Sequence, residues 1–92
     1  MIRTFRDKET EKVFLRHFSR KFQAVAAVAK RKLDHINAAT SLLDLAAIPG
    51  NQLEALKGDR AGRHSIRVND QFRICLRWND GDAHEVEITD YH

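Results

Sequence analysis

The sequence has few of the residues that make disulfides, linkers or membrane spans. It contains one cysteine, one proline and four glycines in 92 residues. The lone Cys75 cannot form an internal disulfide, and no apolar run approaches the roughly 20 residues that a membrane-spanning helix needs. The opening residues, Met1 to Lys8, include no apolar stretch of the kind that forms a signal peptide. We therefore expect a cytoplasmic protein with no membrane partner.

The length and the charge distribution point to one domain with a basic surface. A chain of 92 residues with 42% hydrophobic content suits a single domain over residues 1–92, because a second core could not be built from what remains. The net charge is only +3. Between Lys57 and Arg77, however, six lysines or arginines stand against two acids, whereas residues 78–92 hold five acids and no lysine or arginine. If these two blocks pair in one sheet, the basic charge left over marks a functional surface.

The N-terminal half has helical periodicity. Asp7 is a candidate N-cap for a first helix, whose apolar stripe is Val13, Phe14 and Phe18. Ser41 can cap a short helical turn, and Pro49-Gly50 then begins a loop through residue 62. Between these segments, a second helix ending near residues 38–40 is predicted by apolar residues at three- and four-residue spacing: Phe22, Val25, Ala26, Ala29, Leu33 and Ile36.

From His64 onward the apolar period is two, which predicts an antiparallel sheet. Residues 2–5 could add a short strand. Keeping Val68 and Phe72 on one face requires a three-residue loop, Asn69-Asp70-Gln71, which places Arg67 directly opposite Arg73. The second turn is expected at Asp80-Gly81, with Arg77 paired to Glu85 across the strands. The even positions form the apolar face: Ile66, Val68, Phe72, Ile74, Leu76, Trp78, Val86 and Ile88.

The facing arginines suggest a site for phosphate chemistry. Like charges opposite each other cost a few tenths to about 1 kcal/mol, which a bound anion would relieve. Metal-free RNA cleavage needs a base for the 2′-hydroxyl, positive charge on the phosphorane and a proton for the leaving 5′-oxygen. Arg67, Arg73 and the loop residue Lys57 can supply the charge, and we expect Lys57 and Arg73 to be exposed. Asp90 and His92 are alternative proton acceptors, which the sequence does not separate, and Tyr91 could stack on or orient a base.

Structural explanations exist for the same residues. Arginines on a sheet face are most often solvated, and Lys57 taken alone is an ordinary loop lysine. Asp90 could cap a strand or pair with an arginine, Tyr91 could fill an edge of the core, and a terminal histidine is often frayed. Cys75 is expected to be a packed small residue because no histidine is placed to activate it.

The chain closely resembles the HigB toxins of the RelE-like superfamily, along essentially its whole length. The matching segments are 56–62 (Leu-Lys-Gly-Asp-Arg-Ala-Gly), 65–74 (Ser-Ile-Arg-Val-Asn-Asp-Gln-Phe-Arg-Ile), Trp78, 81–83 (Gly-Asp-Ala) and 90–92 (Asp-Tyr-His). The resemblance implies an α+β fold, with N-terminal helices packed on an antiparallel sheet. Carried onto matching positions, it implies that the working residues are Lys57, Arg67, Arg73, Asp90, Tyr91 and His92.

The resemblance also implies an activity and partners. The expected activity is cleavage of mRNA in the A site of the 70S ribosome, with no metal and no organic cofactor. The expected protein partner is a helix-turn-helix antitoxin of the HigA type, and operator DNA would be contacted only indirectly, through the antitoxin complex. One position departs from the pattern: some members have a histidine where this chain has Glu54, and Arg63 or His64 are candidate substitutes.

Two other functions compete with the nuclease. A ParE-like inhibitor of DNA gyrase would block its target without hydrolysis and would need no general base, so the terminal Asp-Tyr-His counts against it. A passive RNA- or ribosome-binding module would use the arginines for affinity alone. The salt dependence of such a module would be similar to that of the enzyme, so binding data alone cannot separate the two, whereas cleavage products can.

Overall fold

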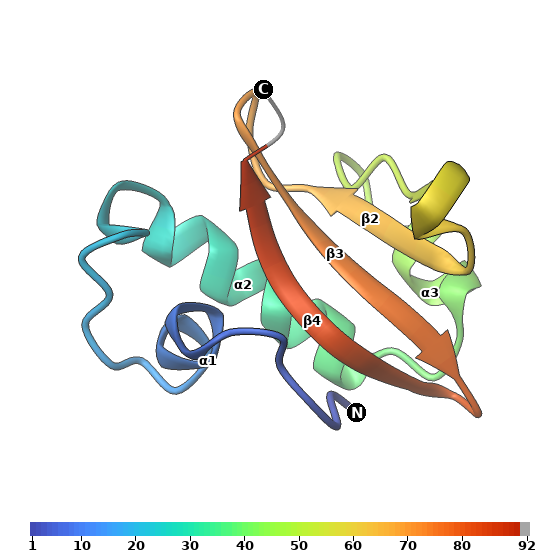
Figure 1. Cartoon of the computed structure of the whole chain (residues 1–92), viewed down its shortest axis with the longest axis horizontal. Helices are drawn as coiled ribbons and strands as arrows, with labels where there is room; N and C mark the ends of the chain where they lie inside the picture. The colour runs from blue at the N-terminus through green and yellow to red at the C-terminus, as the bar shows by residue number, and fades with distance from the viewer. Residues whose placement is uncertain (91–92) are drawn as a thin grey trace.

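Helices cover one face of a four-stranded antiparallel sheet, which confirms the expected α+β class. A computed structural model describes residues 1–90, and Figure 1 shows the strands in front of the helices. The sheet has the order β1-β2-β3-β4, in which each strand is hydrogen-bonded to the next along the chain. The strands are β1 (Glu54–Ala55), β2 (Arg63–Arg67), β3 (Phe72–Asn79) and β4 (Asp82–Asp90).

Helices α1 (Lys8–Phe14) and α3 (Leu42–Ala46) begin at side-chain caps that the sequence predicts. Helix α1 begins after Asp7, whose carboxylate accepts a hydrogen bond from the Thr10 amide over 2.7 Å. Helix α3 begins with a capping box between Ser41 and Asp44. The main helix, α2 (Ala26–Ala38), follows a short 3₁₀ turn, η1 (Gln23–Val25), and ends where the periodicity predicts. Phe18, by contrast, is 71% exposed, because α1 ends at Phe14 and the chain leaves the core there.

Both predicted turns are present, but the hairpin of β3 and β4 contains an irregularity. Arg67 faces Arg73 across β2 and β3, and Asp80 and Gly81 form the second turn with φ of 51° and 78°. Glu85 has φ of 52°, and the ladder shifts between Cys75 and Arg77, so Arg77 pairs with His84 rather than with Glu85. This β-bulge inserts one residue into β4, which simple alternation does not anticipate.

The first residues extend the sheet beyond β4. Ile2 and Phe5 form parallel bridges to Ala83 and Val86, respectively, so the predicted strand over residues 2–5 is present as isolated bridges. The core lies between the sheet and α2, and within residues 1–90 no helix is long and apolar enough to cross a bilayer. Among the core residues are Leu33 and Ile36 from α2 and Ile66, Ile74, Leu76, Val86 and Ile88 from the strands.

Candidate active site on the open sheet face

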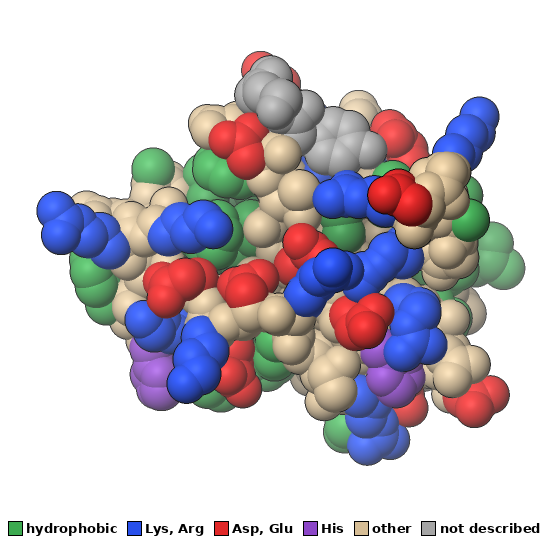
Figure 2. Space-filling view, in the orientation of Figure 1, with side chains coloured by type: hydrophobic (Ala, Val, Ile, Leu, Met, Phe, Trp, Pro, Cys, Tyr) green, Lys and Arg blue, Asp and Glu red, His purple; other side chains and the backbone are tan. Residues whose placement is uncertain are grey.

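The open face of the sheet carries alternating positive and negative side chains. This face is turned away from the helices, and Figure 2 shows lysine or arginine side chains interspersed there with carboxylates. Its arginines come from the odd positions of β2 and β3, because successive residues of a strand point to opposite faces. The carboxylates paired with them come from β1, the turn after β2 and β4: Glu54, Asp70, Glu85 and Glu87. The predicted arginine face therefore exists, but its charges are largely paired.

Arg73 is buried, contrary to the expectation that it would be exposed. Its side chain crosses β2: Nε donates to Ser65 Oγ over 2.8 Å, and Nη2 donates to the Gln52 carbonyl over 2.6 Å. Nη1 also lies 3.7 Å from a carboxylate oxygen of Glu54, leaving Arg73 only 7% exposed. Arg73 is buried because of β1, a strand in a segment that was predicted to be a continuous loop. This short strand pairs beside Ser65 and brings acceptors within reach of the guanidinium.

Arg67 is half-buried and has a carboxylate partner in the adjoining turn. Its Nη2 pairs with Asp70, whose side chain is 99% exposed. The sequence interpretation, which left Arg67 and Arg73 unneutralised, was therefore wrong for both. An ion pair at such an exposed carboxylate contributes about 0–1 kcal/mol, so a phosphate can displace Asp70 at little cost. Of the two arginines, Arg67 is the one more open to a ligand.

A second facing pair, Arg63 and Arg77, was missed as part of the site. Arg63 is 8% exposed and forms an ion pair of 2.9 Å with Glu85. Because Glu85 is on β4, the Arg63 side chain must cross β3. Arg77 lies 3.6 Å from the same carboxylate, so the predicted ion pair of Arg77 with Glu85 is made despite the shifted register. Arg63 therefore points away from Glu54 and does not act as the suggested basic substitute there. The facing pair could have been found by extending the predicted register along β2.

The remaining predicted site residues lie at different ends of the sheet. Asp90 is exposed, faces Phe72 at the end of β4 and accepts a hydrogen bond from Gln71 Nε2 over 3.0 Å. It is thus at the same end as Arg67 and Arg73. Lys57 is exposed and precedes a 3₁₀ turn, η2 (Gly58–Arg60), near the Arg63 end of β2, roughly 13 Å along the strand from Arg67 at about 3.3 Å per residue. Tyr91 and His92 lie outside the described residues.

A buried polar contact behind the sheet supports both predicted arginines. Lys32, on α2, donates from Nζ to Asn51 Oδ1 over 2.5 Å, and burial lowers the Lys32 pKa, with Arg31 and Arg67 adding repulsion. The Asn51 carbonyl accepts the Arg67 amide over 2.7 Å, and the next carbonyl, that of Gln52, accepts from Arg73. Sequence reasoning did not identify Lys32 or Asn51, because Lys32 looks like one of several solvated lysines. The described residues contain no group of three or more potential metal ligands.

Comparison with known proteins identifies the family. A model described as the RelE-like toxin of the type II toxin–antitoxin system HigB matches residues 3–92. A Proteus vulgaris protein named Endoribonuclease HigB is 31% identical over an alignment that covers 100% of both chains. Toxin HigB-1 of Vibrio cholerae is 47% identical over 53 residues, which span 58% of this chain and 56% of that protein.

A solved structure agrees on the fold. A chain of the YoeB-YefM complex from Staphylococcus aureus superposes with a TM-score of 0.58 and covers 100% of this chain and 98% of its own. Its sequence identity is 16%, so this likeness concerns the fold alone. The family match, in contrast, extends over almost every residue. The chain therefore belongs to the HigB-like toxin family, the RelE-like toxins of type II toxin–antitoxin systems.

Proposed function

We propose that this toxin is an endoribonuclease that cuts mRNA in the A site of the bacterial ribosome and so stops translation. The observation that carries the proposal is the pair of arginines at one end of the open sheet face, Arg67 opposite Arg73, with Asp90 at the same end. The name of the Proteus vulgaris relative, Endoribonuclease HigB, supports a nuclease. Action on the ribosome places the protein in the cytoplasm.

The proposed reaction breaks one phosphodiester bond without a metal. The 2′-oxygen attacks the adjacent phosphorus, a bond between them forms, and the bond from phosphorus to the 5′-oxygen breaks. Asp90 or His92 accepts the proton of the 2′-hydroxyl, and an acid group returns a proton to the 5′-oxygen. The products are a 2′,3′-cyclic phosphate and a free 5′-hydroxyl, so electrons and protons balance without an oxidant or cofactor.

Arg67 and Arg73 have different electrostatic roles in the proposed reaction. Arg67 exchanges its exposed partner Asp70 for a phosphate oxygen, because that carboxylate is almost wholly solvated. Arg73, held by Ser65 and Gln52, contributes a fixed positive charge below the phosphate and loses no side-chain entropy when substrate binds. Lys57, being at the far end of β2, contacts a neighbouring phosphate of the message or of ribosomal RNA rather than the scissile one. Tyr91 stacks on or orients a base of the codon.

The toxin acts together with a protein partner. Family membership supports an antitoxin partner, and the Staphylococcus aureus neighbour was solved as a complex of two proteins. We propose that the partner of this chain is a helix-turn-helix antitoxin of the HigA type, and that operator DNA is reached through that complex.

The chemical identity of the RNA ends tests the proposal. Wild-type toxin is incubated with mRNA-programmed ribosomes in the presence and absence of a ribosome-compatible zinc chelator, and the fragments are probed for their ends. Cyclic or 3′-phosphates together with 5′-hydroxyls, at equal rates with and without chelator, are expected. A 5′-phosphate would contradict 2′-hydroxyl attack. Growth arrest with intact message and inhibited DNA gyrase would favour the ParE-like alternative.

A further inference from the structure

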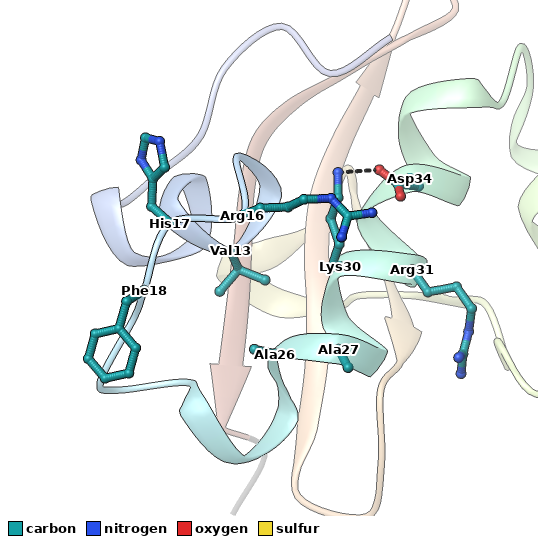
Figure 3. Close-up of a pocket in the computed structure, with 9 residues that line it drawn as sticks. All are labelled: Val13, Arg16, His17, Phe18, Ala26, Ala27, Lys30, Arg31 and Asp34. Atoms are coloured by element: carbon teal, nitrogen blue, oxygen red, sulfur yellow. Dashed lines mark hydrogen bonds and ion pairs between the residues drawn. The ribbon is translucent and has the colours of Figure 1, made fainter.

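A groove lies between the end of α1 and the first half of α2, separate from the open sheet face. The groove is open to solvent and has a volume of about 580 Å³. Val13, Ala26 and Ala27 give it an apolar lining, and Phe18 stands at its edge (Figure 3). The α2 residues that pack on the sheet are others, Ala29, Leu33 and Ile36, so the groove occupies the side of α2 that the sheet leaves uncovered. This is a preformed concave surface of the size that binds several side chains or a small ligand.

The rim of the groove is positively charged. Arg16, at the end of α1, extends toward α2, and Arg31 projects from α2 (Figure 3). Lys30 also lines the groove, but its charge is balanced by Asp34, 2.6 Å away, the single carboxylate of the lining. Within the described part of the chain neither Arg16 nor Arg31 makes an ion pair. The groove therefore has an excess of two guanidinium groups around an apolar centre.

The same region exposes large apolar side chains. Phe18 is 71% exposed and Leu15, at the end of α1, is 51% exposed. Exposed apolar residues next to an apolar cavity, rimmed by charge, are typical of a surface that binds another protein. RNA is a poorer match, because its phosphates would pair with the cations and leave the aliphatic lining of Val13, Ala26 and Ala27 uncovered.

We propose that this groove is the docking site for an acidic, amphipathic segment of the antitoxin; the inference rests on the antitoxin partner proposed above. Apolar side chains of that segment fill the cavity over Val13, Ala26 and Ala27. Its carboxylates pair with Arg16 and Arg31, and Phe18 closes over it. Helix α2 and the sheet separate this site from Arg67 and Arg73, so the docked segment does not itself touch the arginines of the open face.

Charge reversal at the rim tests the proposal directly. The Arg16→Glu, Arg31→Glu double variant and the wild-type toxin are titrated with the cognate antitoxin in the absence of RNA. We expect the double variant to bind at least tenfold more weakly, while its cleavage of ribosome-bound mRNA is unchanged. Arg20→Glu, an exposed arginine outside the groove lining, is the charge control and should bind like wild type. Antitoxin affinity within twofold of wild type in the double variant would overturn the proposal.

Two further variants keep the test decisive if the charge reversal does not fold. Ala27→Trp fills the cavity without changing charge, and Phe18→Ala removes the apolar edge. Leu43→Ala, at a slightly more exposed leucine on α3, is the control for Phe18→Ala. Each groove variant should weaken the antitoxin at least tenfold, and the control should not. The charge reversal could instead abolish a dimer that the wild-type toxin forms, or abolish its binding to ribosomes, while antitoxin affinity is unchanged. Either result would assign the groove to another partner and overturn the proposal. Because antitoxin binding is measured without RNA, its outcome is independent of whether the toxin cuts mRNA.

Discussion

Arg73 and Ser65 form the central contact of the open sheet face. The Arg73 guanidinium donates from Nε to Ser65 Oγ over 2.8 Å and from Nη2 to the Ser65 carbonyl over 3.2 Å. Ser65 is fully buried and Arg73 is 7% exposed. The proposed catalytic arginine is therefore also a structural residue, and its two roles make different predictions.

Arg73→Ala should lower both stability and activity. Removing a buried charged donor leaves Ser65 and the Gln52 carbonyl without their partner, at a cost of about 2–3 kcal/mol. For a domain of this size, that corresponds to a drop of about 10 °C or more in Tm. Thermal unfolding measures it, with Arg67→Ala as the control. That variant removes only an ion pair to an exposed carboxylate, so it should shift Tm by at most a few degrees. Equal shifts in the two variants would contradict the difference in burial.

Asp70→Asn should increase the activity. Asp70 competes with the substrate phosphate for Arg67, and its loss frees the guanidinium. An exposed pair contributes at most about 1 kcal/mol, so kcat/KM should rise by no more than about fivefold. Steady-state cleavage of ribosome-bound mRNA measures this. Asp80→Asn, in the other turn, is the matched control, and a decrease in kcat/KM for Asp70→Asn alone would show that the carboxylate takes part in the reaction.

Lys57→Ala should lower activity without unfolding the domain. Lys57 is exposed, and surface substitutions usually change stability by less than about 0.5 kcal/mol. Its contact to a neighbouring phosphate should be seen mainly in KM, with a smaller slope of affinity against salt concentration. Lys8→Ala, on the exposed part of α1, is the control. A loss confined to kcat would instead place Lys57 at the scissile phosphate.

Asn51→Ala should be strongly destabilising, and the loss should be partly recovered by a second change. The variant leaves Lys32 Nζ buried without its acceptor, which costs about 3 kcal/mol or more. Replacing both partners with apolar residues, as in Lys32→Met with Asn51→Leu, removes that penalty, so the double variant should be more stable than Asn51→Ala. Chemical denaturation compares the two. If the double variant instead loses as much stability as the two single changes together, or more, then loss of the hydrogen bond from Asn51 to the Leu45 carbonyl is the main cause of the destabilisation.

The α3 cap should make stability depend on acid pH. Hydrogen bonds from the Thr40 amide and hydroxyl, then from Ser41, lower the Asp44 pKa below its ordinary 3.8. The folded state therefore favours the carboxylate, and its contribution is present above pH 3.8 and lost as the pH falls further. Asp44→Asn should have a lower Tm than wild type at pH 7, with the difference shrinking below pH 3.8. A constant difference between the two Tm profiles would contradict the lowered pKa.

Much of the fold follows from local sequence signals. The caps at Asp7 and Ser41 and the turn that sets Arg67 opposite Arg73 involve residues close together in the chain, so periodicity and turn chemistry are sufficient to predict them. The β-bulge at Glu85 was missed because its trace in the sequence is slight: the buried positions of β4 change from odd to even at the bulge, but Ala83 is a weak apolar signal before Val86 and Ile88.

The environment of the site was less predictable. The burial of Arg73 depends on β1, only two residues long, and on the Gln52 carbonyl, 21 residues away. Lys32 and Asn51 are 19 residues apart, and neither has a sequence pattern that marks it as buried. Such contacts depend on tertiary packing, which the alternation of apolar residues does not predict.

Cleavage of mRNA on the ribosome can be observed by primer extension on a defined mRNA, free in solution and in programmed ribosomes, with the wild-type toxin and with Arg67→Ala. We expect cuts within the A-site codon only when ribosomes are present, and a rate of cutting about 10²–10³-fold lower in the variant. An intact message in programmed ribosomes, with growth still arrested by the wild-type toxin, would contradict this expectation.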